Sequence, residues 1–260
     1  MAGQDDTAAV EVIEGRHEAG VLFICDHASN ALPEAYATLG LPQSELQRHI
    51  AYDIGAAHIT RRLAEQFQAP AVLTRFSRLL IDANRGADDP TLVMRLSDGK
   101  IVPGNAKVDA AEIAHRTRLF WQPYRHAISG RIEAMMATGA LPVVVSLHSF
   151  TESWRGHLRP WEIGILWDND PRFATLLIAA LAADGIRVGD NEPYDGALLG
   201  DTLYDEVTRR GLAGLLIETR QDLIREPNEA LAWADRLGKV LRPILARPEL
   251  HQIAHFPSRT

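Results

Sequence analysis

Two histidines follow apolar segments that are typical of buried β-strands. His27 comes directly after residues 21–26, and His148 lies near the end of residues 143–150. The carboxyl ends of parallel strands in an open α/β sheet border the crevice in which ligands bind. Glu218 lies near the end of a third apolar segment, so we expect two imidazoles and one carboxylate to meet in this crevice. A single histidine of this kind is more often structural, but the combination is typical of a catalytic zinc site.

A third protein ligand is needed to complete such a site. Helical spacing across residues 43–67 places Asp53 on the apolar face of a predicted helix, which it shares with His49. An inward-facing carboxylate is costly unless it is paired or bound to a metal. Asp53 is therefore either the third metal ligand or the partner of His49 or of an arginine. Asn30, three residues after His27, is the other possible ligand, although a neutral amide is a poor zinc donor.

Three arginines lie close to predicted strand ends. Arg78 precedes a short predicted strand at residues 79–82, and Arg85 follows it. Arg220 comes two residues after Glu218 and is therefore expected on the same face of its strand. A guanidinium matches a carboxylate in two hydrogen bonds. Each arginine alone could balance a neighbouring acid, but three around one crevice indicate an anionic substrate.

Strand-like segments alternate with helical patterns along the chain, which is typical of a mostly parallel sheet covered by helices. Beyond those already described, we predict strands at residues 71–74, 161–167, 186–188 and 214–220, and helices at residues 109–137, 171–184, 201–210 and 228–245. Residues 86–108 form a long irregular segment, with a possible hairpin at Asp98-Gly99, and are a candidate lid. No linker or repeat divides the chain, so we expect one α/β domain over residues 1–260, with its core at about 20–245.

The overall composition excludes several classes of protein. The 260 residues are 46% hydrophobic and 23% charged, which is typical of a globular chain with a substantial core. The formal net charge of -7 argues against nucleic-acid binding, and no apolar run reaches the roughly 18 residues of a membrane span. The acidic start lacks the features of a signal peptide, and Cys25, the single cysteine, cannot form an intrachain disulfide. We therefore expect a cytoplasmic protein that binds neither nucleic acid nor membranes; its oligomeric state is left open.

Four short motifs together resemble the N-formylglutamate amidohydrolase family over about residues 20–245. In order, they are Asp26-His27-Ala28-Ser29-Asn30, the run from Ser77 to Arg85, Leu147-His148-Ser149-Phe150, and Ile217-Glu218-Thr219-Arg220. The resemblance implies a three-layer α/β/α domain with a mostly parallel mixed sheet, related in fold to zinc carboxypeptidases. It also implies one zinc ion. The family has an aspartate on the helix after the first strand, which makes Asp53 the third ligand beside His27 and His148.

The resemblance further implies roles for the polar residues around the metal. Glu218 activates water as the base, Arg78 polarises the scissile carbonyl, and Asn84 with Arg85 holds the substrate carboxylate. The His-x-x-Glu ligand pair of the carboxypeptidases is replaced here, because Asn30 follows His27 at the fourth position. The segment Asp26-His27-Ala28-Ser29 also differs from the Pro-His-Ser-Gly type of the best-defined deformylases.

These expectations combine into one functional hypothesis. The chain is expected to be a zinc-dependent amidohydrolase that cleaves a small anionic N-acyl amino acid similar to N-formylglutamate, with Arg220 as a further substrate contact. Two alternatives keep the same fold. One is a zinc peptidase or cell-wall amidase, and the other is a ligand-binding protein without catalytic activity.

Overall fold

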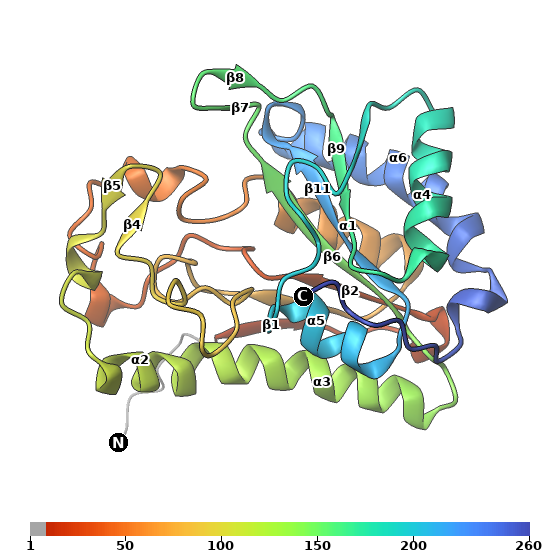
Figure 1. The fold of residues 1–260 in the computed structure, drawn as a ribbon, viewed down its shortest axis with the longest axis horizontal. Helices are drawn as coiled ribbons and strands as arrows, with labels where there is room; N and C mark the ends of the chain where they lie inside the picture. Colours follow the sequence, from red (N-terminus) through yellow and green to blue (C-terminus); the bar gives the residue numbers. More distant parts are fainter. Residues whose placement is uncertain (1–8) are drawn as a thin grey trace.

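A seven-stranded mixed sheet forms the centre of the molecule, in the order β1-β3-β2-β6-β11-β9-β10 (Figure 1). The computed structural model describes residues 9–260. The strands are β1 (Val10–Ile13), β2 (Val21–Cys25), β3 (Ala71–Thr74), β6 (Val143–Phe150), β9 (Ile163–Leu166), β10 (Val188–Asp190) and β11 (Gly214–Arg220). Strands β3, β2, β6 and β11 run parallel to one another, and β10 runs parallel to β9. Strands β1 and β9 lie antiparallel to their neighbours β3 and β11.

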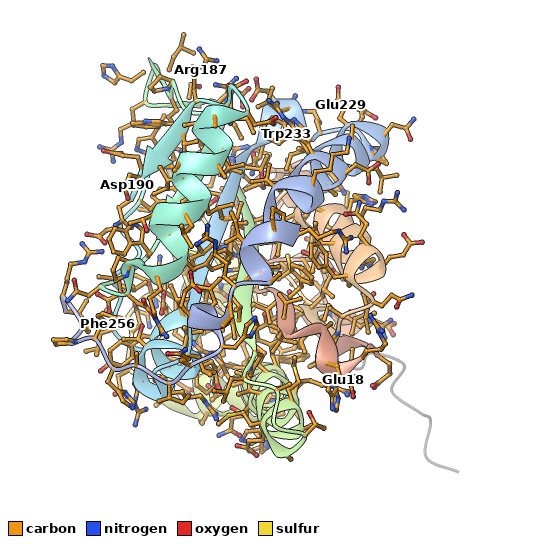
Figure 2. The ribbon with its side chains drawn as sticks, turned by 90° about the vertical axis from the view of Figure 1, so that its right-hand side faces the viewer. Glu18, Arg187, Asp190, Glu229, Trp233 and Phe256 are labelled. Atoms are coloured by element: carbon orange, nitrogen blue, oxygen red, sulfur yellow. The ribbon has the colours of Figure 1, made fainter. Side chains whose placement is uncertain are left out.

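The central strands are buried along most of their length, and apolar up to their carboxyl ends, because both faces of the sheet are covered by helices. On one face, α1 (Ala56–Phe67), α4 (Pro171–Ala183) and α6 (Pro227–Leu245) share a core with the sheet, and Figure 2 shows α4 and α6 side by side. On the other face lie α2 (Ala110–Arg116), α3 (Gln122–Ala137) and α5 (Thr202–Glu206), of which α3 and α5 contribute to a second core. This arrangement confirms the predicted three-layer α/β/α fold.

Two small hairpins lie apart from the main sheet. The first joins β4 (Leu96–Ser97) to β5 (Lys100–Ile101), with the predicted turn at Asp98-Gly99, where both residues have positive φ angles of 44° and 72°. The second joins β7 (Ser153–Trp154) to β8 (His157–Leu158) and was not predicted. Short 3₁₀ turns connect other elements at His17–Ala19, Glu34–Tyr36, Glu45–Gln47, Pro103–Asn105, Thr208–Arg210, Gln221–Leu223 and Pro248–Leu250.

Two predicted elements are wrong in ways that affect the site. The helix expected over residues 43–67 begins only at Ala56, because Gly55 has a left-handed backbone with a φ of 82° that interrupts any earlier helix. Asp53 therefore lies in a turn before α1. The strand expected at residues 79–82 is a buried turn, in which the amide of Leu80 donates to the carbonyl of Ser77.

The strands predicted at residues 71–74, 143–150 and 214–220 are present with the same ends, and the other predicted elements have changed ends. The helix expected over residues 109–137 begins as predicted, since the Asp109 side chain accepts a hydrogen bond from the Glu112 amide, but a π-helical segment at Thr117–Trp121 separates α2 from α3. The helix expected at residues 201–210 is shortened to α5 and a 3₁₀ turn, and the strand expected at 186–188 is shifted to β10. Within residues 9–260, no helix is long and apolar enough to cross a membrane.

Candidate active site

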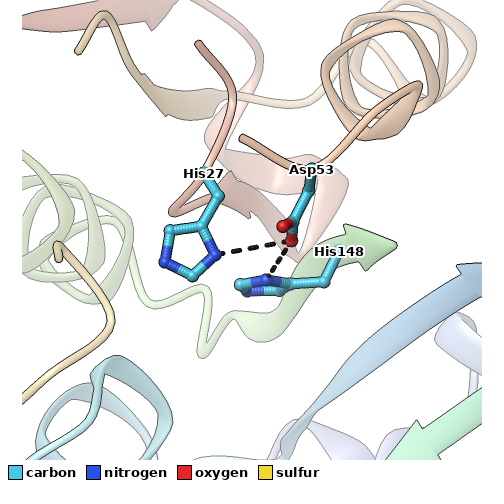
Figure 3. Close-up of side chains that lie close together, drawn as sticks. All are labelled: His27, Asp53 and His148. Atoms are coloured by element: carbon cyan, nitrogen blue, oxygen red, sulfur yellow. Dashed lines mark hydrogen bonds and ion pairs between the residues drawn. The ribbon is translucent and has the colours of Figure 1, made fainter. Parts of the chain in front are cut away.

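His27, Asp53 and His148 converge on one point at the carboxyl ends of β2 and β6 (Figure 3). The Nδ1 atom of His148 lies 2.7 Å from Oδ2 of Asp53, and Nδ1 of His27 lies 3.4 Å from the same oxygen. The turn that carries Asp53 is fixed to the strand end, because the Asp53 amide donates to the His27 carbonyl at 2.9 Å. All three side chains are buried, and one donor atom from each lies within 4.8 Å of the others.

Each imidazole contacts one further carboxylate on the side opposite to Asp53. The Nε2 atom of His27 lies 2.7 Å from Oδ1 of Asp82, and Nε2 of His148 lies 2.9 Å from Oδ2 of Asp26. Histidines that bind metals typically donate their second ring N–H to such a partner, which fixes the orientation of the ring. Two imidazole nitrogens and one carboxylate oxygen are also the ligands that catalytic zinc prefers. The donor set therefore fits a divalent cation, and sequence reasoning missed the parts that Asp26 and Asp82 play in it.

The charges of this cluster stabilise one another. Burial disfavours the ionised form of Asp53, but the imidazoles of His27 and His148 outweigh it and hold the Asp53 pKa below its usual range. Burial likewise favours the neutral form of both imidazoles, yet the surrounding carboxylates raise the pKa of each histidine. Without a metal, the carboxylates thus favour the protonated form of both imidazoles, and the imidazoles favour the ionised form of Asp53. A divalent cation would take the place of the protons on Nδ1.

Glu218 lies next to this cluster, and its carboxylate is buried. It pairs in register with His148 across β11 and β6, and 6% of its surface is exposed. Its Oε2 atom is buried and has no hydrogen-bond partner among the described residues. Burial, reinforced by the negative charge of Asp53, outweighs the nearby imidazoles and raises the Glu218 pKa to about 7. A carboxylate of this kind is suited to accept a proton near neutral pH.

Three of the predicted substrate-contacting residues lie near the cluster. Arg78 donates to Oδ2 of Asp82 through Nη2 at 2.7 Å and Nε at 3.1 Å, and its Nη1 lies 3.6 Å from Oδ1 of Asp53. The side-chain oxygen of Asn84 accepts a hydrogen bond from the Thr202 amide at 3.1 Å. Arg85 lies beside Asn84 and also borders the cavity in front of the cluster.

Three other expectations about the site are corrected by the structure. Arg220 does not border the cavity, because its guanidinium pairs with Asp222 at 2.7 Å just beyond the end of β11. Asn30 does not border the cavity, and its amide nitrogen donates to the Leu46 carbonyl at 2.8 Å. His49 borders the cavity, but its nearest carboxylate is that of Asp98 at 3.6 Å and not that of Asp53.

A cavity of about 470 Å³ opens over the cluster. Of the predicted site residues, those that border it are His27, Asp53, Arg78, Asn84, Arg85, His148 and Glu218. The candidate lid at residues 86–108 contributes no side chain to its wall. Residues 149–151 and 194–198 border the cavity instead, together with Leu166, Leu203 and Leu216. The structure thus brings together seven residues from five separate segments of the chain.

Comparison with known proteins identifies relatives over nearly the whole chain. A family model described as N-formylglutamate amidohydrolase matches residues 19–225. The crystal structure of a gene product from Agrobacterium tumefaciens is 37% identical, covering 93% of this chain and 96% of its own, with a TM-score of 0.86. An N-formylglutamate amidohydrolase from Ralstonia eutropha is 20% identical, covering 92% of this chain and 97% of its own, with a TM-score of 0.71, and shares the fold. No curated protein matches the chain.

Proposed function

Because the chain belongs to the N-formylglutamate amidohydrolase family and is a hydrolase of amide bonds, we propose that it is a metal-dependent enzyme that releases an amino acid from its N-acyl derivative. The proposed metal is one zinc ion held by His27, Asp53 and His148. The observation that carries the proposal is the convergence of these three donors beside Glu218, whose buried carboxylate oxygen has no partner among the described residues.

The metal and the surrounding side chains would contribute different parts of the chemistry. When bound, a divalent cation would supply a Lewis acid that favours water ionisation and polarises the amide carbonyl. Glu218 would accept a proton from the attacking water as the new carbon–oxygen bond forms. It would then donate that proton to the leaving nitrogen as the amide carbon–nitrogen bond breaks. The products are a carboxylic acid from the acyl group and a free amine on the amino acid.

The arginines would provide positive charge beside the amide oxygen and the carboxylate of the substrate. Arg78 lies within reach of the cluster and would donate to the oxygen that becomes negative in the transition state, as donors of an oxyanion hole do. Arg85 and Asn84 would bind the substrate carboxylate and so set the position of the amide. The cavity of about 470 Å³ favours a small substrate over a peptide or a cell-wall fragment.

Metal content and hydrolysis measured on the same sample test the proposal. The purified protein, loaded with zinc, is expected to bind one ion per chain and to hydrolyse N-formyl or N-acetyl amino acids. His148→Ala removes one proposed ligand and is expected to lose both the ion and the activity. Activity that persists in the metal-free protein would refute the proposed role of the metal.

A further inference from the structure

The cavity contains two guanidinium groups, which are the side chains best suited to hold a carboxylate. Arg78 donates two hydrogen bonds to Asp82 and lies 3.6 Å from Asp53, so its charge is already balanced within the protein. Arg85 also borders the cavity, and its guanidinium forms no hydrogen bond or ion pair with any residue between 9 and 260. One guanidinium is therefore left to bind an anion.

The histidines in the cavity wall do not provide a second anion site. His27 and His148 face Asp53 as the proposed metal ligands. The Nε2 atom of His49 is buried without a hydrogen-bond partner among the described residues, and burial lowers the pKa of this imidazole, which disfavours its charged form. Its Nε2 atom is also directed towards Asp98 at 3.6 Å.

Arg159 is a third guanidinium close to the cavity, and it lies outside the cavity wall. Its charged group stacks over the rings of Phe150 and Tyr194, at 5.6 and 5.1 Å from their centroids. It also donates to the hydroxyl of Thr151 at 3.1 Å. Arg159 thus contacts side chains that border the cavity without bordering it itself.

Four leucines form an apolar part of the remaining wall, separate in sequence from the polar Ser149, Thr151 and Gln221 that also border the cavity. They are Leu166 and Leu216, which pair in register across β9 and β11, Leu203 in α5, and Leu198 in the preceding loop. The two acids that border this part of the wall offer no cation: Asp195 pairs with Arg259 outside the wall at 2.7 Å, and the Asp201 carboxylate accepts a hydrogen bond from the Tyr204 amide at 2.7 Å. This part of the cavity therefore favours an apolar group and offers an anion no cation in its wall.

We propose that the amino acid part of the substrate carries an apolar side chain, so that the N-acyl substrate has one carboxylate instead of the two of N-formylglutamate. This inference rests on the proposed function and specifies its substrate. Arg85 and Asn84 would bind the α-carboxylate, and the leucines would contact the side chain. A second carboxylate would lose its hydration without gaining a cation, and this unpaired charge would exclude glutamate derivatives.

A set of three substrates of similar size tests the proposal on the wild-type, zinc-loaded protein. N-formylleucine, N-formylglutamine and N-formylglutamate differ in whether the side chain is apolar, polar or charged, and the N-acetyl series repeats the comparison. The expected order of kcat/KM is leucine, glutamine, glutamate, with leucine at least about tenfold above glutamate. A glutamate derivative that equals or exceeds the leucine derivative would overturn the inference.

Binding measurements separate this inference from the proposed function. Calorimetric titration of the same compounds into zinc-loaded Glu218→Gln, which we expect to bind without turnover, reports affinity alone. If none of the compounds is hydrolysed by the wild type, the proposed function fails. The order of affinities then still decides the inference, because tighter binding of the leucine compound supports it and tighter binding of the glutamate compound refutes it.

Two neighbouring leucines provide a matched pair of variants. Leu198 borders the cavity, whereas Leu199 does not and is 63% exposed. Leu198→Arg is expected to raise the preference for N-formylglutamate over N-formylleucine at least about tenfold by adding the missing cation. Leu199→Arg adds the same charge outside the cavity and is expected to leave the preference unchanged. A wild-type preference for glutamate that Arg159→Gln removes would overturn the inference and identify Arg159 as the second anion site.

Discussion

The Nε2 atom of His148 lies 2.9 Å from Oδ2 of Asp26, on the side of the imidazole opposite to Asp53. The same Asp26 carboxylate accepts hydrogen bonds from the hydroxyls of Ser146 and Thr202, at 2.8 and 2.5 Å. Only 1% of the Asp26 surface is exposed, so water does not compete for these hydrogen bonds. Asp26 therefore fixes the orientation of the His148 ring and directs Nδ1 towards the proposed metal position.

Replacing Asp26 is expected to weaken metal binding although Asp26 is not a proposed ligand. Asp26→Asn keeps the size of the side chain and removes the charge that makes His148 a stronger donor. The apparent zinc affinity should fall by about 10- to 100-fold, as is common for partners of metal-bound histidines. Competition with a chromogenic chelator measures it. Asp222→Asn, which removes an exposed acid outside the cavity, is the control, and an equal affinity in both variants would contradict the positioning role.

Replacing Glu218 is expected to separate metal binding from turnover. Glu218 is not among the three converging donors, and its Oε2 has no partner in the described part of the chain, so Glu218→Gln should retain one zinc ion per chain. Loss of the proton acceptor should lower kcat by about 10²- to 10⁴-fold. Metal analysis and kinetics on one preparation measure both effects. Normal turnover with normal metal content would exclude Glu218 as the base.

The strand-end residues could be predicted from the sequence because their positions depend on short local patterns. Buried parallel strands are recognisable as apolar runs, and the carboxyl ends of such strands lie at one edge of the sheet. His27, His148 and Glu218 each follow from this rule alone. Arg220 does not, because it is the last residue of β11, where a side-chain partner in the next turn, Asp222, determines its direction.

The segment before α1 shows why other parts could not be predicted. Leu46 and Ile50 recur at helical spacing, but they pack with Leu39, Leu79 and Val102 in a small separate cluster. A compact loop that buries its own apolar side chains produces the same spacing as an amphipathic helix. Asp53 reaches the predicted place in the site although the element that carries it differs, since a turn and a helix can both direct a side chain inward.

Gly55 is expected to be required for the turn that carries Asp53. Its φ of 82° is unfavourable for other residues, and a β-carbon there would overlap the carbonyl oxygen of Ile224. Gly139 has a similar φ of 86° but has no atom within 4 Å of an added β-carbon. Gly139→Ala should lower the free energy of unfolding by about 1 kcal/mol, whereas Gly55→Ala should cost at least about 2 kcal/mol more because of the overlap. Denaturant unfolding of both variants measures the difference, and equal losses would show that close packing at Gly55 is unimportant.

Metal binding is expected to release protons and to strengthen as pH rises. Carboxylates around His27 and His148 outweigh burial and raise the pKa of both imidazoles, so each binds its proton more tightly than a free imidazole does when no metal is present. A cation that binds to the Nδ1 atoms must displace these protons. Raising the pH lowers the proton concentration and so weakens the competition between protons and the metal. Calorimetry in buffers of different ionisation enthalpy should detect a release of about one to two protons per ion at pH 7. An affinity that stays constant between pH 6 and 8 would contradict the proposed ligands.

Arg85 is expected to bind the substrate through its carboxylate and through no other group. Arg85→Gln should therefore lower kcat/KM for N-formylleucine by about 100-fold, the range expected when a charge-assisted contact is lost. The same variant should have little effect on N-formylleucine amide, which lacks the carboxylate. Arg220→Gln is the matched control, because Arg220 pairs with Asp222 outside the cavity and should leave both substrates unaffected. If Arg85→Gln impairs the acid and the amide equally, the residue supports the structure of the cavity and does not recognise the carboxylate.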